Sequence, residues 1–373
     1  MDYKSATDFL LYIFKNWKII SQFFKKKKFL NENPKFLIEN YDDEVIIEKE
    51  IPYVLLHKFY NGDSKQTIEY CNKIKLRIER SKFHLENDGN NIIKTFQIAA
   101  LKAFEERISE DGSVVRLSKI EMSNKDDSIE FIMQHAKYTD QVKSNLVLDW
   151  SDHKVSNITT LRDYLKVKYG NSLPPLDCNL LANTIGISCI LYFKSGRQYI
   201  PYLPKRTKFK PNLNTDISNK TQLAVFDEGG IHVTASGALD FPLALSDPSK
   251  LNFYKLFTED MLRELYEEVG IMESDIKEIV PLALTRELLR GGKPQIFYAG
   301  ILNDGIREEE LKLRRLNAIA RAIKNKNEKI EVEKEALSIY NTEQLIKEST
   351  QHGLTLEALG NLFYSQEYIN KMY

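Results

Sequence analysis

The sequence has few cysteines, no excess of charge of either sign and no long uninterrupted apolar run. Its 373 residues include only Cys71, Cys178 and Cys189, an odd and widely spaced set that fits neither a disulfide framework nor a zinc cluster. The 53 lysines and arginines equal the 53 aspartates and glutamates, so any affinity for nucleic acid or a membrane must come from a local patch. We therefore expect a cytoplasmic protein, and nucleic acid is not its favoured partner.

The most apolar stretch near the start of the chain, residues 9–24, is interrupted by Lys15 and Lys18. It is shorter than the roughly 20 uninterrupted apolar residues of a transmembrane helix, and it lacks the cleavage site of a secretory signal. Its apolar residues have helical spacing, and four lysines follow at 25–28. This pattern fits a packed amphipathic helix with a solvated basic end or an interfacial anchor. We favour the packed helix and expect no transmembrane segment.

Two domains are predicted from the length of the chain. Apolar residues make up 42% of it, enough to fill hydrophobic cores and to exclude an intrinsically disordered protein. Gly170, Pro174 and Pro175 place the boundary after residue 170. Residues 1–170 are predicted to form a mixed helix and strand domain of unknown role, with strands at 44–56, 114–122 and 128–134 and a helix at 91–108.

Residues 171–373 are predicted to form a mixed sheet covered by helices, because strands and helices alternate along them. Strands are expected at 184–193, 198–203, 222–226, 231–235, 279–284 and 294–302, with another extended segment at 330–340. Helices are expected at 258–270, 307–324, 342–348 and 355–364. The helix at 307–324 should bury an apolar stripe that consists of Leu311, Leu316, Ile319 and Ile323.

One predicted helix carries an unusual concentration of carboxylates. It should begin after Thr258 as N-cap and end at Gly270, a typical left-handed C-terminal residue. Its acidic side chains share about 100° of arc, and its apolar ones form a separate stripe. The acidic set consists of Asp260, Glu264, Glu267 and Glu268; the apolar set consists of Met261, Leu262, Leu265 and Val269.

This concentration of negative charge is locally unfavourable. Like charges three and four residues apart repel each other, and the helix dipole disfavours anions in the last turn. Arg263 offsets part of the repulsion by pairing with Glu267 or Asp260. A divalent cation would neutralise the rest, and oxygen ligands favour Mg²⁺ or Mn²⁺ over zinc. The alternative is a solvated acidic helix face.

The string Arg263-Glu264-Leu265-Tyr266-Glu267-Glu268-Val269-Gly270-Ile271 resembles the core of the Nudix box, R-E-U-x-E-E-x-G-U, where U is aliphatic. Upstream, the segment 231–239 (IHVTASGAL) resembles the strand and glycine loop that open that box. The similarity covers about residues 181–373. It implies an α+β or α/β fold, in which a Nudix-like mixed β-sheet is sandwiched by helices beside a separate mixed α/β N-terminal domain.

One departure separates this sequence from the usual box. Gly237 precedes Arg263 by 26 positions instead of the usual 14, so 12 residues are inserted. Lys255 stands where the box has an intervening glutamate, and Asp240 is the nearest acidic residue after the glycine. The segment 241–254 is therefore expected to form an extra loop at the site.

The resemblance implies hydrolysis of the pyrophosphate bond in a nucleoside diphosphate linked to another group, with Mg²⁺ as the cofactor and Mn²⁺ as the alternative. By position, Glu267 and Glu268 are implied as metal ligands, with Glu264 as a further ligand or catalytic carboxylate. Arg263 would hold the glutamates, and the backbone carbonyl of Ser236, beside Gly237, would be a loop ligand. The general base is left open between Glu264 and a glutamate outside the box; the outside candidates are Glu287, Glu308, Glu309 and Glu310.

Basic residues outside the acidic helix are the candidates for contacts with the substrate. Lys205 and Arg206, together with Gly237, are candidates for binding the substrate, although a solvated basic loop is an equal alternative. Around the turn at 291–292, Arg286, Arg290 and Lys293 invite the same two interpretations, and Phe297 and Tyr298 are expected in the core. The partner is expected to be a nucleotide-derived small molecule such as a nucleotide sugar, ADP-ribose or a dinucleotide, and a homodimer is possible. The alternative functions are a non-catalytic nucleotide sensor and an RNA end-processing hydrolase.

Overall fold

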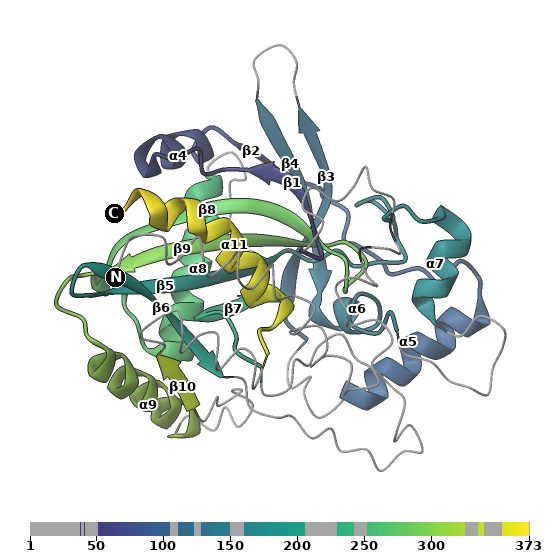
Figure 1. The fold of residues 1–373 in the computed structure, drawn as a ribbon. Helices are drawn as coiled ribbons and strands as arrows, with labels where there is room; N and C mark the ends of the chain where they lie inside the picture. Colours follow the sequence, from purple (N-terminus) through teal and green to yellow (C-terminus); the bar gives the residue numbers. More distant parts are fainter. Residues whose placement is uncertain are drawn as a thin grey trace.

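The computed structural model contains two β-sheets (Figure 1). It describes residues 38, 41, 51–104, 111–122, 128–149, 160–205, 230–241, 252–324, 335–338 and 353–372. The larger sheet has the order β1-β8-β9-β5-β6-β10, and β7 pairs with β5 beside this path. Its strands are β1 (Tyr53–Lys58), β5 (Gly186–Ser195), β6 (Gln198–Lys205), β7 (Ala235–Ala238), β8 (Ile276–Glu287), β9 (Lys293–Leu302) and β10 (Glu335–Ser338). The chain is therefore a mixed α/β protein.

Within the larger sheet, β5 and β9 run parallel and the other pairs run antiparallel. The smaller sheet has the order β2-β4-β3, with β2 parallel to β4. Its strands are β2 (Lys75–Ile78), β3 (Ser113–Met122) and β4 (Ile129–Lys137). Both sheets are therefore mixed, because each contains one parallel pair among antiparallel ones. Strands that pair in parallel must be joined by a helix or another long crossover connection.

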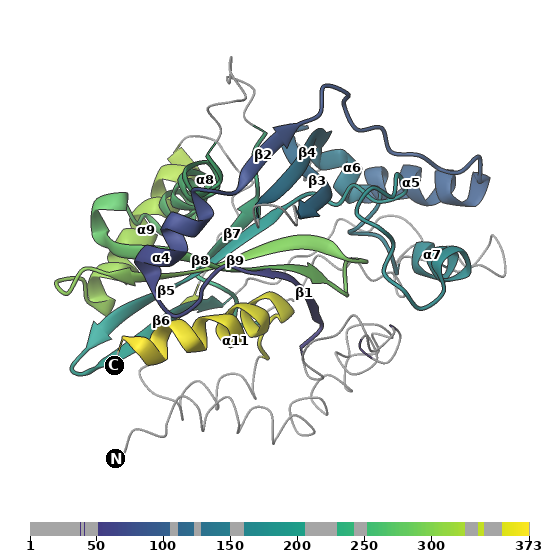
Figure 2. The same ribbon diagram turned by 90° about the horizontal axis from the view of Figure 1, so that it is seen from above.

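Helices cover both faces of the larger sheet (Figure 2). α8 (Phe253–Val269) packs on one face with Ile187, Leu284 and Ile296 in one apolar cluster. α11 (Leu356–Lys371) packs on the other face, where Phe297 and Val280 lie in a second cluster. The remaining helices are α4 (Ser64–Cys71), α5 (Asn91–Phe104), α6 (Tyr138–Val142), α7 (Leu161–Tyr169), the 3-10 turn η3 (Glu273–Asp275) and α9 (Glu308–Lys324). Within the described residues, no helix combines the length and apolar character needed to cross a bilayer.

Three predictions about local structure were wrong. The strand expected at 231–235 is displaced to β7, so the glycine segment itself lies in the sheet. α8 is capped by Asn252 and begins at Phe253, because an apolar turn with Phe253 and Phe257 buried precedes Thr258. In α9, Leu316 is 61% exposed instead of buried, whereas Leu311 is buried as predicted; the side chains of Ile319 and Ile323 lie outside the description. The predicted segments 222–226 and 342–348 lie outside the described residues.

The first half of the chain contributes to the larger sheet. β1 pairs antiparallel with β8, so Tyr53 lies opposite Glu287 and Lys58 lies opposite Ala283. Phe59 and Cys71 belong to the same apolar cluster as Ile187. The two predicted halves therefore share a strand pairing and a core, and the division into 1–170 and 171–373 stays a prediction.

Buried polar groups from the first half also fix the turn between β8 and β9. Arg162 on α7 donates to the carbonyl oxygens of Leu288, at 3.0 Å, and Leu289, and it pairs with Asp149 at 2.6 Å. Asn145 donates to the carbonyl oxygen of Arg290 at 2.9 Å. Because these donors are buried, the turn cannot move without leaving charged or amide groups unpaired.

Replacing Arg162 with Met should strongly destabilise the protein. The change leaves the carboxylate of Asp149 buried without its cation and removes two donors to the turn, for a loss of about 3–5 kcal/mol in unfolding free energy. Lys168→Met on the same helix is the matched control, since its pair with Asp88 is partly exposed and should be worth about 1 kcal/mol or less. Equal midpoints for the two variants in urea unfolding would contradict this role of Arg162.

Candidate functional site

The carboxylates predicted to act together lie on α8. A local signal fixes each end of this helix. The side chain of Asn252 accepts a hydrogen bond from the backbone N–H of Lys255 at 2.9 Å, and Gly270 ends the helix with φ 73°. A β-carbon at Gly270 would lie 2.6 Å from the carbonyl oxygen of Arg314, so α9 approaches closely there. Met261, Leu265 and Val269 are buried, as predicted, and they turn the acidic residues toward β7.

Arg263 lies at the centre of the acidic group. Its guanidinium contacts the carboxylates of Asp260 at 2.7 Å, Glu264 at 2.8 Å, Glu267 at 3.0 Å and Asp240 at 3.1 Å. Both predicted pairings of Arg263 are thus present together. Burial opposes the charge of Arg263, but the surrounding carboxylates, Glu264 first, raise its pKa. Arg263 therefore stays protonated and holds the carboxylates at one end of the helix.

Glu264 is the most enclosed of the box glutamates paired with Arg263. Its side chain is 13% exposed and packs against β7, where a β-carbon at Gly237 would lie only 2.2 Å from Glu264 Oε1. Burial raises the pKa of Glu264 to about 8; Arg263 opposes this rise, while Asp260 and Glu267 add to it. A glycine is thus required at 237 because of close approach, and the carboxyl group beside it can gain or lose a proton near neutral pH.

Ser236 and Asp240 connect the glycine segment to the same helix. The backbone N–H of Ser236 donates to Glu268 at 3.1 Å, and the backbone N–H of Asp240 donates to Asp260 at 2.8 Å. Burial raises the pKa of Asp240, with Arg263 opposing the rise. Asp240 therefore joins the acidic group despite the insertion, whereas Lys255 is 72% exposed and pairs with Glu259 on the outside of the helix.

The donor set fits a hard divalent cation in its chemistry. Glu264, Glu267 and Glu268 offer only carboxylate oxygens, and the backbone of Ser236 lies beside them. Among the described residues, no three His, Cys, Asp or Glu side chains already stand in a metal-binding arrangement. Arg263 lies among the carboxylates instead, so a cation would have to share them with that guanidinium.

Other residues predicted for the site lie elsewhere or outside the described part. Lys205 ends β6, where it lies opposite Glu335 of β10. Arg206 and most of the inserted segment, 242–251, lie outside the described residues. Among the candidates for a distal base, Glu287 pairs with Arg290, while Glu308 and Glu310 pair with Lys312 and Arg314 on α9. Phe297 and Tyr298 are both buried, as expected.

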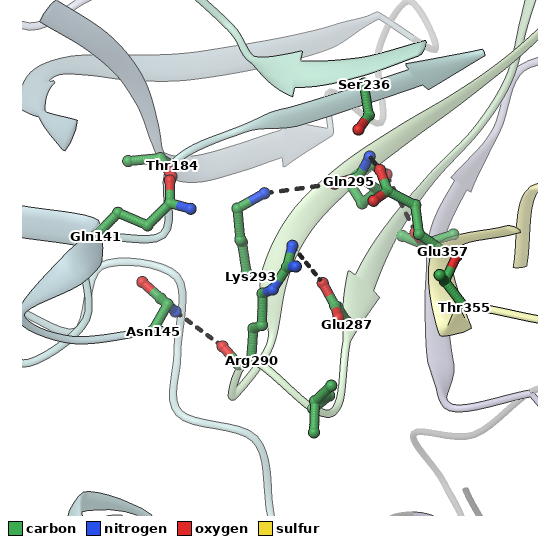
Figure 3. Close-up of polar contacts among 12 residues, drawn as sticks. Gln141, Asn145, Thr184, Ser236, Glu287, Arg290, Lys293, Gln295, Thr355 and Glu357 are labelled. Atoms are coloured by element: carbon green, nitrogen blue, oxygen red, sulfur yellow. Dashed lines mark hydrogen bonds and ion pairs between the residues drawn. The ribbon is translucent and has the colours of Figure 1, made fainter. Parts of the chain in front are cut away.

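A second polar cluster lies on the α11 side of the sheet, beside the turn at which the sequence marked Arg290 and Lys293 (Figure 3). Lys293 and Gln295 of β9 are buried there with Glu287 of β8. Gln295 donates to Glu357 of α11 at 2.8 Å, and Arg290 pairs with Glu287 at 3.3 Å. The sequence marked Arg290 and Lys293 beside the glycine pair, but it did not place Glu357 with them, because Glu357 is far away along the chain.

Replacing Gly237 with Ala should disturb the contact between β7 and α8. The new methyl group would overlap the carboxyl group of Glu264, and we expect a loss of about 1–2 kcal/mol in unfolding free energy from overpacking. Gly305→Ala is the matched control, because a β-carbon there meets nothing within 4 Å and should change stability by less than about 0.5 kcal/mol. Urea unfolding of both variants checks this; an unchanged Gly237→Ala protein would refute the close packing.

No family model matches the sequence, and no curated protein matches it. Among solved structures, the chain is similar to a mutT/nudix family protein from Listeria innocua, with 11% sequence identity and a TM-score of 0.21. The match covers 39% of this chain and 96% of that one. A likeness at this level establishes neither family membership nor an activity for this chain.

Proposed function

We propose that the chain hydrolyses the pyrophosphate bond of a nucleoside diphosphate derivative in a reaction that depends on Mg²⁺ or Mn²⁺. The observation that carries this proposal is the acidic end of α8, where Glu264 and Glu268 contact β7 at Gly237 and Ser236. The same residues form the string that resembles the Nudix box. A solvated acidic helix face would not require a glycine opposite Glu264 or a backbone donor opposite Glu268.

In this proposal, Glu267 and Glu268 hold the cation, with Glu264 and the carbonyl of Ser236 as further ligands. When bound, the cation would neutralise the charge that develops on the pyrophosphate oxygens and lower the pKa of bound water. Arg263 orients the carboxylates, because it contacts Glu264 and Glu267 at once. Gly237 leaves the space that Glu264 occupies.

Glu264 is also the best candidate for accepting a proton from the attacking water. A general base works best when its pKa lies near the working pH, and burial raises the pKa of Glu264 to about 8. The distal candidates are less suitable, since Glu308 and Glu310 are engaged in ion pairs on α9 and Glu287 pairs with Arg290. Glu264 would therefore combine ligand and base roles, with Asp240 and Asp260 keeping Arg263 in place.

A substrate screen tests the reaction class. With Mg²⁺, the purified chain should release a nucleoside monophosphate from at least one of ADP-ribose, a nucleotide sugar or a dinucleotide, as detected by chromatography. No product from these, from nucleoside triphosphates or from capped RNA would exclude hydrolysis. Thermal stabilisation by a nucleotide without product would instead indicate a binding protein, since a ligand at 100 times its Kd adds about 2.7 kcal/mol.

The roles of the two adjacent glutamates can be tested in the same assay. Glu267→Gln and Glu268→Gln should each lower kcat/KM by about 100-fold or more, because each removes a charged ligand that stabilises the transition state by several kcal/mol. Glu259→Gln is the matched control: Glu259 lies on the same helix but pairs with Lys255 at 3.8 Å on its exposed side. Full activity in both box variants, with folding checked by circular dichroism, would remove these residues from the mechanism.

A further inference from the structure

His232 is a buried side chain that joins the glycine segment to α11. It is 3% exposed; its Nε2 lies 3.1 Å from Ser236 Oγ, and its Nδ1 lies 2.9 Å from Thr355 Oγ1. Thr355 is the N-cap of α11, where its hydroxyl oxygen accepts a hydrogen bond from the backbone N–H of Ala358 at 3.1 Å. An imidazole held at both nitrogens cannot turn without leaving a buried polar group unpaired.

The neighbours of the imidazole determine which of its nitrogens carries the hydrogen. Glu357 Oε2 lies 3.6 Å from His232 Nε2, and a carboxylate only accepts hydrogen bonds. It therefore favours a hydrogen on Nε2, which Ser236 Oγ accepts, while Nδ1 accepts the hydroxyl hydrogen of Thr355. Gln295 of β9 donates to the other oxygen of Glu357 at 2.8 Å, so this carboxylate is itself held in place (Figure 3).

The backbone around His232 is fixed independently of the side chain. Its N–H donates to the carbonyl oxygen of Pro204 on β6 at 2.8 Å. The preceding residue, Ile231, donates to the carbonyl oxygen of Gly353 at 2.8 Å and accepts from the N–H of Thr355 at 2.9 Å. The imidazole therefore reaches β7 from a frame that consists of β6 and the segment before α11.

Ser236, the partner of His232 on β7, connects this frame to α8. Backbone hydrogen bonding alternates along an antiparallel pair, and Leu239 donates to the carbonyl oxygen of Ile185 at 2.9 Å. Three positions before Leu239, the N–H and carbonyl groups of Ser236 therefore point away from β5. The N–H donates to Glu268 of α8 at 3.1 Å, so the carbonyl group lies along the same edge of β7.

We propose that His232 is a positioning residue that acts through Ser236. By holding the hydroxyl group, it fixes the carbonyl group of Ser236 and, through the backbone N–H, the carboxylate of Glu268 for the divalent cation. The inference rests on the proposed function for that cation. Without the imidazole, the hydroxyl group loses its partner, and β7 has only four residues and pairs with β5 alone among the described strands.

Mn²⁺ binding to the full chain without nucleotide tests this role separately from hydrolysis. Titration followed by electron paramagnetic resonance of free Mn²⁺ gives the Kd. His232→Phe keeps an aromatic ring but removes both hydrogen bonds, and it should raise the Kd about 10-fold or more, as expected for the loss of a group that orients metal ligands. His232→Gln, whose amide group can donate to Ser236, should keep the Kd within about threefold of wild type.

His57→Phe is the matched control. His57 Nε2 lies 2.8 Å from the hydroxyl group of Tyr70, so this change also removes a partly buried contact between a histidine and a hydroxyl group. His57 lies on β1, and β8, β9 and β5 separate β1 from β7 in the sheet. The variant should lower the stability of the fold and change the Kd for Mn²⁺ by less than about twofold.

The outcomes separate the two proposals. An unchanged Kd in His232→Phe, a loss that His57→Phe shares, or a loss that His232→Gln does not restore would overturn the positioning role. If His232→Phe does not fold, Ser236→Ala decides, because it removes the hydroxyl group, keeps the backbone carbonyl and should raise the Kd about threefold or more.

Hydrolysis provides the remaining distinction. Mn²⁺ binding that depends on His232 in a protein without hydrolytic activity would retain the positioning role and discard the hydrolase. Hydrolysis with a cation affinity that is independent of His232 would do the reverse. A wild-type chain that binds no Mn²⁺ would overturn the positioning role together with the cation on which it rests.

Discussion

The site depends on the close approach of one helix to an edge strand. The carboxyl group of Glu264 occupies space that any side chain at Gly237 would fill, and the neighbouring backbone N–H of Ser236 contacts Glu268. Burial in this contact makes the negative charge costly, and Arg263 compensates by contacting four carboxylates. The packing of α8 and the charge balance of its acidic end are therefore coupled. Gly237 makes room for the carboxyl group of Glu264, and Arg263 compensates the negative charge that this packing buries.

The rest of the fold holds the two sides of this contact in place. Met261, Leu265 and Val269 bury the opposite face of α8 against β5 and β9, and Gly270 lets α9 approach the end of the helix. On the far face of the sheet, His232 contacts Thr355, the N-cap of α11, at 2.9 Å, while its other nitrogen contacts Ser236. The β7 segment is thereby tied to a helix on each face. A strand of four residues with one partner strand would be poorly fixed without these contacts.

Local sequence was enough to predict α8, its C-terminal end and its acidic face, because periodicity, Gly270 and charge spacing are properties of neighbouring residues. It was not enough for the start of the helix, since Phe253 and Phe257 gain their stability from the core. The place of Asp240 beside Arg263 depends on how the chain returns after the insertion. The glycine pair at 291–292 marked Arg290 and Lys293, but the contact of Gln295 with Glu357 joins β9 to α11, so no spacing along the sequence could reveal that partner.

The first half of the chain has a physical connection to the turn between β8 and β9, whatever its boundary as a domain. Arg162 and Asn145 fix the backbone of the turn that carries Arg290, and β1 completes the sheet beside β8. Gln141 of α6 accepts a hydrogen bond from the hydroxyl group of Thr184, just before β5. Because the charged groups at this turn are buried, displacing α6 or α7 would leave them without their partners, which is costly. The turn between β8 and β9 is thus held by contacts between the two halves of the chain, while the acidic helix depends mainly on the second.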